Sequence, residues 1–265
     1  MIRHLLATGV ATGIALAGMA QTKAGFVQYE MVTQLQGQIQ IQGLPPGVEL
    51  PKSRTSYFEL SFGNNQSLWQ TAEQGPEPDM NAGGVQLRTV TFGGAGDVVF
   101  ADFNTKMKTE KKELFDKTFI VEDSIRTQNW KMTGETKTIL GYPSMKATTT
   151  RITKTFKTTM MDGKMERVEG VDTLTVQAWF TTAIPVSAGP ALYEGQLPGL
   201  ILELDFGNGR TVYKATSVSE KVKLDSIKPP KGKKKHTPAE YEAERKKVID
   251  EMQKNGGMRF RTTAG

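Results

Sequence analysis

The sequence predicts a mostly β protein, in which a strongly curved antiparallel sheet, bowl-like or half-barrel in shape, precedes a carboxyl-terminal helix. Three observations support this fold class. Short stretches of alternating apolar and polar residues recur along the chain. Clusters of Gly, Asn and Pro separate these stretches, as turns separate the strands of antiparallel sheets. A clear helix start signal occurs only near the carboxyl end.

The first half of the chain reads as short strands joined by turns and loops. Strands are expected at residues 26–35, 54–62, 66–71, 85–92, 98–104, 105–115 and 119–123. The second and third should form a hairpin with Phe58 on its apolar face, because Gly63, Asn64 and Asn65 between them tolerate positive φ. Residues 43–53 and 73–84 are rich in Pro or Gly and are expected to be loops.

The second half continues the strand pattern. Strands are expected at residues 130–133, 138–142, 145–159, 164–168, 173–180, 200–206 and 211–219. Asp162 and Gly163 carry a strong hairpin signal, and residues 207–209 carry a second one. Both hairpins should join neighbouring antiparallel strands.

A helix is expected to begin at Thr237. Pro238 suits the first helical position, and Glu240 completes a capping box with Thr237. The helix should end at the Asn and Gly residues of 255–257. Its apolar face is expected to contain Tyr241, Val248, Ile249 and Met252. The helix should therefore lie on the surface of the domain, and residues 258–262 are expected to form a short final strand.

The segment 179–204 contains two proline-centred corners, so it cannot be one helix. The first corner lies at Pro185. The second lies at Leu197, Pro198 and Gly199, where Pro followed by Gly favours a type II turn with positive φ at Gly199. This corner is expected to be chiefly structural and to fix the register of the strand that follows it.

The amino terminus has the pattern of a signal peptide. Arg3 precedes the apolar run 5–17, and cleavage is expected after Ala20 or, alternatively, after Ala24. The run is shorter than the roughly 20 residues that cross a bilayer, so an integral membrane protein is not expected. The expected organisation is a signal peptide at 1–20, a curved sheet domain at 21–228, a lysine-rich linker at 229–236 and a helical tail at 237–265.

Charge and residue usage exclude several classes of function. The net charge of +6 is concentrated in the linker lysines, so a nucleic-acid partner is not expected. The chain has no Cys, which excludes disulfides and cysteine nucleophiles. Its two histidines are His4 in the signal and His236 in the linker, so no His-based triad or multi-His metal site can form. Neither a metal nor a cofactor is expected.

Three blocks of the sequence resemble the GLPGLI family of exported proteins of unknown function. Residues 197–201 match its name-giving hexapeptide, although Gln196 replaces the first Gly. Residues 179–190 resemble its Trp and IPxSxGP block, and 139–147 resemble its ILGYxCxxA block with Ser144 in place of Cys. The resemblance implies a curved sheet, similar in shape to the bowl-like domain that precedes some secreted glycan-cleaving amidases and to periplasmic lipoprotein carriers.

The resulting functional hypothesis is a noncatalytic binding module, located in the periplasm or at the cell surface of a Gram-negative bacterium, whose concave face receives a peptide, a lipid chain or a protein partner. The expected binding residues are Trp179, Pro185, Pro190, Tyr193, Leu197, Pro198 and Gly199. The alternative for these residues is that they only turn corners and fill the core. A concave face that is packed solid or charged throughout would contradict a ligand carrier.

A carboxylate-based hydrolase acting on envelope glycans is the alternative function. It would require two Asp or Glu side chains within about 10 Å in an open cleft. The candidates are Asp172, Glu203 and Asp205, although alternation alone explains polar residues at these positions. Met160, Met161 and Met165 crowd one hairpin tip, where they would contact a soft ligand, a metal ion or a partner surface, or be incidentally exposed.

Overall fold

One curved sheet of 12 strands dominates the computed structural model, which describes residues 24–35, 52–72, 81–82, 85–86, 97–114, 117–161 and 164–254. Its strands are β1 (Gly25–Gln34), β2 (Ser53–Gly63), β3 (Gln66–Thr71), β6 (Val98–Asp102), β7 (Met107–Leu114), β8 (Lys117–Ser124), β9 (Lys131–Ile139), β10 (Tyr142–Met161), β11 (Lys164–Thr181), β12 (Leu200–Phe206), β13 (Thr211–Ser219) and β14 (Lys235–His236). β4 (Asn81–Ala82) and β5 (Val85–Gln86) form a separate two-stranded sheet.

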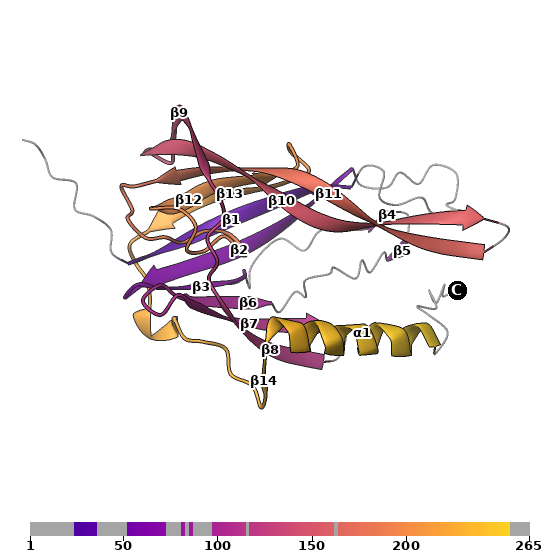
Figure 1. Ribbon diagram of the computed structural model, residues 1–265. Helices are drawn as coiled ribbons and strands as arrows, with labels where there is room; N and C mark the ends of the chain where they lie inside the picture. Colours follow the sequence, from indigo (N-terminus) through magenta and orange to yellow (C-terminus); the bar gives the residue numbers. More distant parts are fainter. Residues whose placement is uncertain are drawn as a thin grey trace, which may run out of the picture.

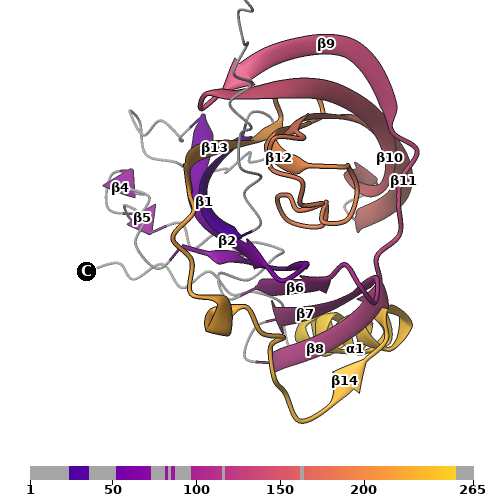
Figure 2. The ribbon, with the colours of Figure 1, turned by 90° about the vertical axis from the view of Figure 1, so that its left-hand side faces the viewer.

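The strand order in the large sheet is β14-β8-β7-β6-β3-β2-β1-β13-β12-β11-β10-β9. Neighbours are antiparallel except for β14 and β8, which are parallel. Figure 2 shows that the sheet bends around a concave inner side, with β9 at one edge and β14 at the other. The expected mostly β fold with a curved, open sheet and one carboxyl-terminal helix, α1 (Pro238–Lys254), is confirmed.

Local turn chemistry explains the two best-defined hairpins. Asn64 and Asn65 both adopt positive φ between β2 and β3, as the Gly-Asn-Asn signal predicted. Residues 207–209 also have positive φ and join β12 to β13. Phe58 packs against the core as expected.

The strands of the second half are longer than expected. Two predicted pieces, 130–133 and 138–142, are replaced by a continuous β9 and by a turn in which Leu140 and Gly141 have positive φ. Likewise, 164–168 and 173–180 are parts of one strand, β11, which runs on through Gly170 because Thr155 of β10 pairs with it. A cross-strand ladder stabilises residues whose local propensity for a strand is weak.

Some expectations lie outside the described residues. They concern the signal peptide, most of the loops at 43–53 and 73–84, most of the strand at 85–92, the Asp162-Gly163 turn, and the segments 255–257 and 258–262. The side chains of Met160, Met161 and Met165 also lie outside the described part.

The inner face of the sheet is packed against residues 182–199, here called the inner loop. Tyr29, Leu60 and Leu202 of the sheet form one buried cluster with Ile184 and Val186 of this loop. A second buried cluster joins further residues of the inner loop to β10, β11 and β12; it consists of Ala147, Val176, Ala178, Phe180, Tyr193, Leu197, Ile201 and Leu204. Figure 2 shows the loop inside the curve of the sheet. The chain therefore fills much of its own concavity.

Helix α1 covers the β7–β8 end of the same face. Residues paired across strands share a face of the sheet. Glu110 of β7 pairs with Val99 of β6, which belongs to the buried cluster of the inner face, and with Val121 of β8. The side chains of Glu110 and Val121 therefore also lie on the inner side. Val121 belongs to a buried cluster with Val248 of α1.

The predicted capping box of α1 is confirmed. The backbone N–H of Thr237 donates to Oε2 of Glu240 at 2.7 Å, and the Glu240 N–H donates to Oγ1 of Thr237 at 3.3 Å. The last two residues of the expected linker form β14. There, His236 is buried against Phe119 with its ring centroid 5.5 Å away, and its Nδ1 lies 3.3 Å from the Ile120 carbonyl oxygen.

The corner at Leu197, Pro198 and Gly199 differs from the expected type II turn. Gly199 does not adopt positive φ, so that prediction is wrong. Instead, the Gly199 backbone passes directly against the carbonyl group of Thr181, and a Cβ at this position would clash with it. Close approach of two backbones, rather than a left-handed conformation, requires glycine here.

Candidate functional site

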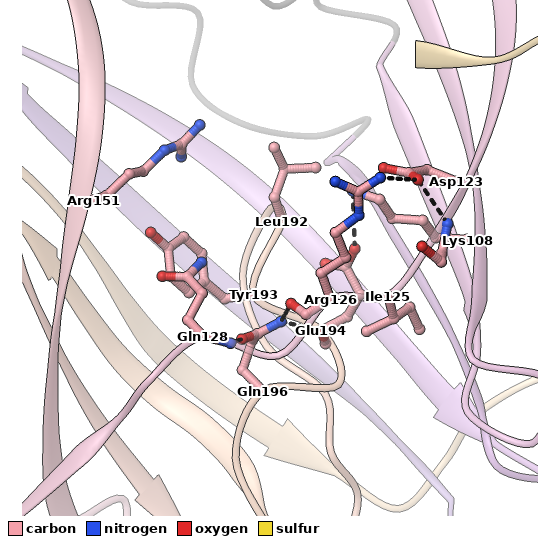
Figure 3. A pocket seen from close by; sticks show the side chains of 11 residues that line it. Lys108, Asp123, Ile125, Arg126, Gln128, Arg151, Leu192, Tyr193, Glu194 and Gln196 are labelled. Atoms are coloured by element: carbon pink, nitrogen blue, oxygen red, sulfur yellow. Dashed lines mark hydrogen bonds and ion pairs between the residues drawn. The ribbon is translucent and has the colours of Figure 1, made fainter. Parts of the chain in front are cut away.

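A pocket of about 220 Å³ lies on the inner side of the sheet, where the inner loop meets β7, β8 and the connection from β8 to β9. It is lined by Lys108, Asp123, Ser124, Ile125, Arg126, Gln128, Arg151, Leu192, Tyr193, Glu194 and Gln196. Figure 3 shows Arg151 on one side of Leu192, and Lys108, Asp123 and Arg126 on the other. These residues come from four segments that are distant in the sequence.

Gln196 joins the two walls of this pocket, which are the inner loop and the connection from β8 to β9. Its buried side chain donates from Nε2 to the carbonyl oxygen of Arg126 at 2.8 Å. Its Oε1 accepts from the Gln128 N–H at 2.9 Å and from Nε1 of Trp130 at 3.4 Å. The amide therefore ties the β8–β9 connection to the inner loop, a role that the Gly found here in the resembling hexapeptide could not perform.

Gly195 allows this close contact. Its φ is +71°, which favours glycine, and a Cβ would lie 2.5 Å from Cγ2 of Ile125. A larger residue at this position would separate the two walls.

Glu194 is the most unusual group in the pocket. Its residue is only 3% exposed, and its Oε2 has no hydrogen-bond partner among the described residues. Burial raises the pKa of Glu194 to about 8, although Lys108 opposes this shift with its Nζ 3.9 Å from Oε1. At neutral pH most of this carboxyl is therefore protonated and can donate a hydrogen bond.

Glu110 lies beside the same lysine and behaves in the opposite way. It is buried, but Lys108 lies 2.7 Å away and Lys112 forms a second ion pair. Burial alone would raise the pKa of Glu110, yet the attraction of Lys112 and Lys108 outweighs it and holds the pKa below its ordinary value. Lys112 also lies 5.5 Å from the centroid of the Tyr241 ring on α1. A charged row thus separates the inner loop from α1.

Tyr193 supplies the second buried polar group of the pocket. The residue is 1% exposed, and its ring packs against Trp130 and Phe206, with centroids 6.0 and 5.2 Å away. Burial raises the pKa of its hydroxyl. The hydroxyl lies toward Arg151 and Gln128 but forms no hydrogen bond of standard geometry with a described residue. Arg151 itself is exposed and has no carboxylate partner in the described part of the chain.

The structure separates the seven residues that the sequence suggested for binding. Tyr193 lines the pocket. The others are distributed as follows: Pro190, Leu197 and Gly199 are buried, Pro185 and Pro198 are exposed, and Trp179 lies on the outer face of the sheet. The residues that complete the pocket were not predicted. The available signal was a lone acidic residue, Glu194, within the largely apolar segment 184–202.

Trp179 forms a cation–π contact on the outer face. Nζ of Lys137 lies 4.2 Å from its ring centroid, and Nζ of Lys146 lies 5.7 Å from it. Lys137 also pairs with Glu203 at 2.8 Å, and Lys146 pairs with Glu135 at 3.0 Å. Both lysines thus contact the Trp179 ring and a carboxylate, so Trp179 is part of a packed outer surface.

The carboxylates proposed for hydrolysis have separate partners. Asp172 pairs with Arg210 at 3.8 Å, and Oδ1 of Asp205 accepts from the Gly209 N–H at 2.7 Å. Glu203 is held by Lys137. Within the described ranges, no three His, Asp or Glu residues are grouped as metal ligands.

Comparison with known proteins identifies relatives of part of the chain and of its fold. Residues 130–203, which contain β9, β10, β11 and the inner loop, match the model of a family described as "Protein of unknown function (Porph_ging)". That description gives no activity and does not name the GLPGLI family. No curated protein matches the chain.

The solved structures that resemble the chain include two crystal forms of PNGF-II. The form in space group P21 has 18% sequence identity and a TM-score of 0.51, and the match covers 83% of this chain and 32% of PNGF-II. The C2 form has 18% identity, the same coverages and a TM-score of 0.49. The chain thus spans about a third of the length of PNGF-II, and the likeness concerns the fold alone. Among the described helices, none has the length and apolar character of a membrane span.

Proposed function

We propose that this chain is a noncatalytic binding module of the GLPGLI type, exported to the periplasm or the cell surface of a Gram-negative bacterium. Its ligand is a peptide or a segment of a protein partner, and the binding site is the pocket beside Glu194. The export pattern at the amino terminus and the three GLPGLI-like blocks support the first part of this proposal.

The observation that carries the site is a pair of buried oxygen atoms that form no hydrogen bond with a described residue. Tyr193 and Glu194 both line the pocket and are almost fully buried; the unpaired atoms are the Tyr193 hydroxyl oxygen and Oε2 of Glu194. A buried polar group that lacks a hydrogen bond costs about 1–3 kcal/mol. A ligand that supplies the missing partners removes this cost, so the pocket is suited to polar recognition.

The size of the pocket favours part of a ligand over a whole small molecule. Its volume of about 220 Å³ is below the roughly 300–1,000 Å³ of sites that enclose a drug-sized ligand. One residue of a peptide fits such a space, while the remainder of the chain stays outside.

The packing of the inner loop argues against the lipid ligand that the sequence also allowed. Ile184 and Val186 occupy the inner face against β1, β2 and β12. Tyr193 and Leu197 occupy it against β11 and β12. The pocket found in the described part of the chain is lined mainly by polar side chains, which do not suit an acyl chain.

A hydrolase remains the competing function, and Glu194 is the group that would serve it. A carboxyl with a raised pKa suits a general acid. The carboxylates that could act as the second group of such chemistry are already ion-paired, since Glu110 is paired with two lysines and Asp123 lies 3.5 Å from Arg126. Binding without catalysis therefore accounts better for the geometry.

The test is recovery of the ligand from the bacterial envelope. Tagged wild-type chain is isolated, and bound material is identified by mass spectrometry. Arg151→Ala removes a cation that lines the pocket, whereas Arg210→Ala removes an exposed arginine paired with Asp172 and is the matched control. We expect a peptide or protein that is lost from Arg151→Ala and retained by Arg210→Ala.

Two results would contradict the proposal. One is a ligand that both variants retain, because the site would then lie elsewhere. The other is turnover of purified envelope glycans by the wild-type chain that Glu194→Gln abolishes, because this would establish the hydrolase.

A further inference from the structure

The pocket beside the inner loop is lined largely by groups that donate hydrogen bonds. Lys108, Arg126 and Arg151 are cations and can only donate. The buried Tyr193 hydroxyl and the neutral form of the Glu194 carboxyl add two further donors. Asp123 is the acceptor with a full negative charge in the lining, and Arg126 lies 3.5 Å from it.

The charges of the lining are not balanced. Lys108 is shared between Glu110 at 2.7 Å and Glu194 at 3.9 Å, and Arg126 is paired with Asp123. Arg151 adds a positive charge at the side of the pocket formed by β10, where it has no carboxylate partner among the described residues. A ligand that accepts hydrogen bonds and carries negative charge complements this arrangement.

We propose that the pocket binds a carboxylate group, specifically the C-terminal carboxylate of a peptide, with Arg151, Tyr193 and Glu194 as its main donors. This inference rests on the proposed binding function and names the chemical group recognised at that site. A planar carboxylate matches the fork of a guanidinium.

Binding of an anion next to Glu194 requires that this carboxyl stay protonated. The charged and titratable groups around it are Lys108, Glu110 and Lys112 on β7, Asp123 on β8, Arg126 on the β8–β9 connection, Arg151 on β10 and Tyr193 on the inner loop. Above pH 8 an ionised Glu194 would repel a bound carboxylate. Affinity should therefore fall as the pH rises through this range.

The probe for this inference is a dansylated Gly-Ala-Ala tripeptide with a free carboxylate, compared with the same tripeptide as its C-terminal amide. Fluorescence anisotropy with the full chain at pH 7 should give an affinity at least about tenfold higher for the acid than for the amide. Tyr193→Phe and Arg151→Ala should each weaken binding of the acid severalfold, while Arg210→Ala should not change it. Circular dichroism of each variant checks that it is folded.

The pH profile distinguishes the role of Glu194. In the wild type, affinity for the acid should decrease between pH 7 and 9. Glu194→Gln keeps an N–H donor that does not ionise. This variant should bind at pH 7 and show a flat profile over the same range.

Several results would overturn this inference and leave the proposed function standing. They are equal binding of the acid and the amide, binding of neither, and tighter binding of inorganic phosphate than of the acid. If free glucuronate displaces the dansylated acid as strongly as the unlabelled tripeptide acid does, the recognised carboxylate belongs to a sugar, and the assignment to a peptide is overturned. Recovery of an envelope ligand that depends on Arg151 is measured separately and decides the proposed function by itself.

Discussion

At the scale of single residues, Glu110 and Glu194 show how environment decides the charge of a carboxyl group. Both side chains are buried, and both lie near Lys108. Glu110 has two close lysine partners, so the Coulomb attraction exceeds the cost of burial. Glu194 shares one of these lysines at a longer distance, so the cost of burial prevails. The same residue type thus gives a fixed anion and a neutral donor.

The raised pKa of Glu194 predicts a defined dependence of stability on pH. Below the ordinary value of 4.5 the group is neutral in the folded and unfolded states. As the pH rises from 4.5 toward 8, the unfolded chain loses this proton and the folded chain keeps it, so the free energy of unfolding falls. Each unit of pKa difference corresponds to about 1.4 kcal/mol, so the loss should reach a few kcal/mol above pH 8.

Denaturant unfolding of wild type and Glu194→Gln checks this prediction. The two proteins should have similar stabilities at pH 4, and the variant should be the more stable at pH 9. A difference in stability that stays constant from pH 4 to pH 9 would show that Glu194 does not titrate differently in the folded state.

At the scale of elements, the inner loop is positioned by close backbone contacts. Gly199 lies against Thr181 at the end of β11, where a register irregularity in the β11–β12 ladder falls between Trp179 and Phe180. Gly189 lies against Ile201, and a Cβ there would be 2.6 Å from its Cδ1. These glycines allow the loop to fold back over the strand that follows it.

Gly199→Val should therefore destabilise the fold, because a branched side chain must displace backbone rather than a flexible side chain. We expect a loss of about 1–3 kcal/mol, as for other overpacked sites. Pro198→Ala, at the exposed neighbouring position, should change stability by less than about 0.5 kcal/mol. Thermal unfolding measures both. An unchanged melting temperature for Gly199→Val, with loss of ligand binding, would make the corner a recognition site instead.

The elements also show what the sequence could predict. Alternation and turn chemistry are local, and they identified the β2–β3 hairpin, the β12–β13 hairpin and the start of α1. The continuous strands β9 and β11 were divided in the prediction, because the pairing that stabilises Gly170 lies on another strand. The close contact between Gly199 and Thr181 is equally non-local.

The candidate site was predictable only in part for the same reason. Tyr193 lies between two blocks of the family resemblance, was expected to bind a ligand, and does line the pocket. Lys108, Arg126 and Arg151 come from other strands and connections. Without knowledge of the strand pairing, the sequence does not show that these residues lie close to Glu194.

At the scale of the whole molecule, the curved sheet does not present an empty bowl. The inner loop covers one part of the inner face and α1 covers another, with the Glu194–Lys108–Glu110–Lys112 row between them. Figure 2 shows how the bend of the sheet brings β7 and β8 to the side of the inner loop. The pocket at this meeting point is thus a product of the overall curvature.

Hydrogen–deuterium exchange of the full chain, with and without the ligand recovered from the envelope, tests whether the ligand binds at the inner loop. Bound ligand should slow exchange of the amides in residues 125–130 and 192–196, which form the two walls of the pocket. Amides of β11 around Trp179, whose side chain lies on the outer face of the sheet, should exchange at the same rate in both samples. Protection around Trp179 alone, with unchanged exchange at 125–130 and 192–196, would contradict a binding site at the inner loop.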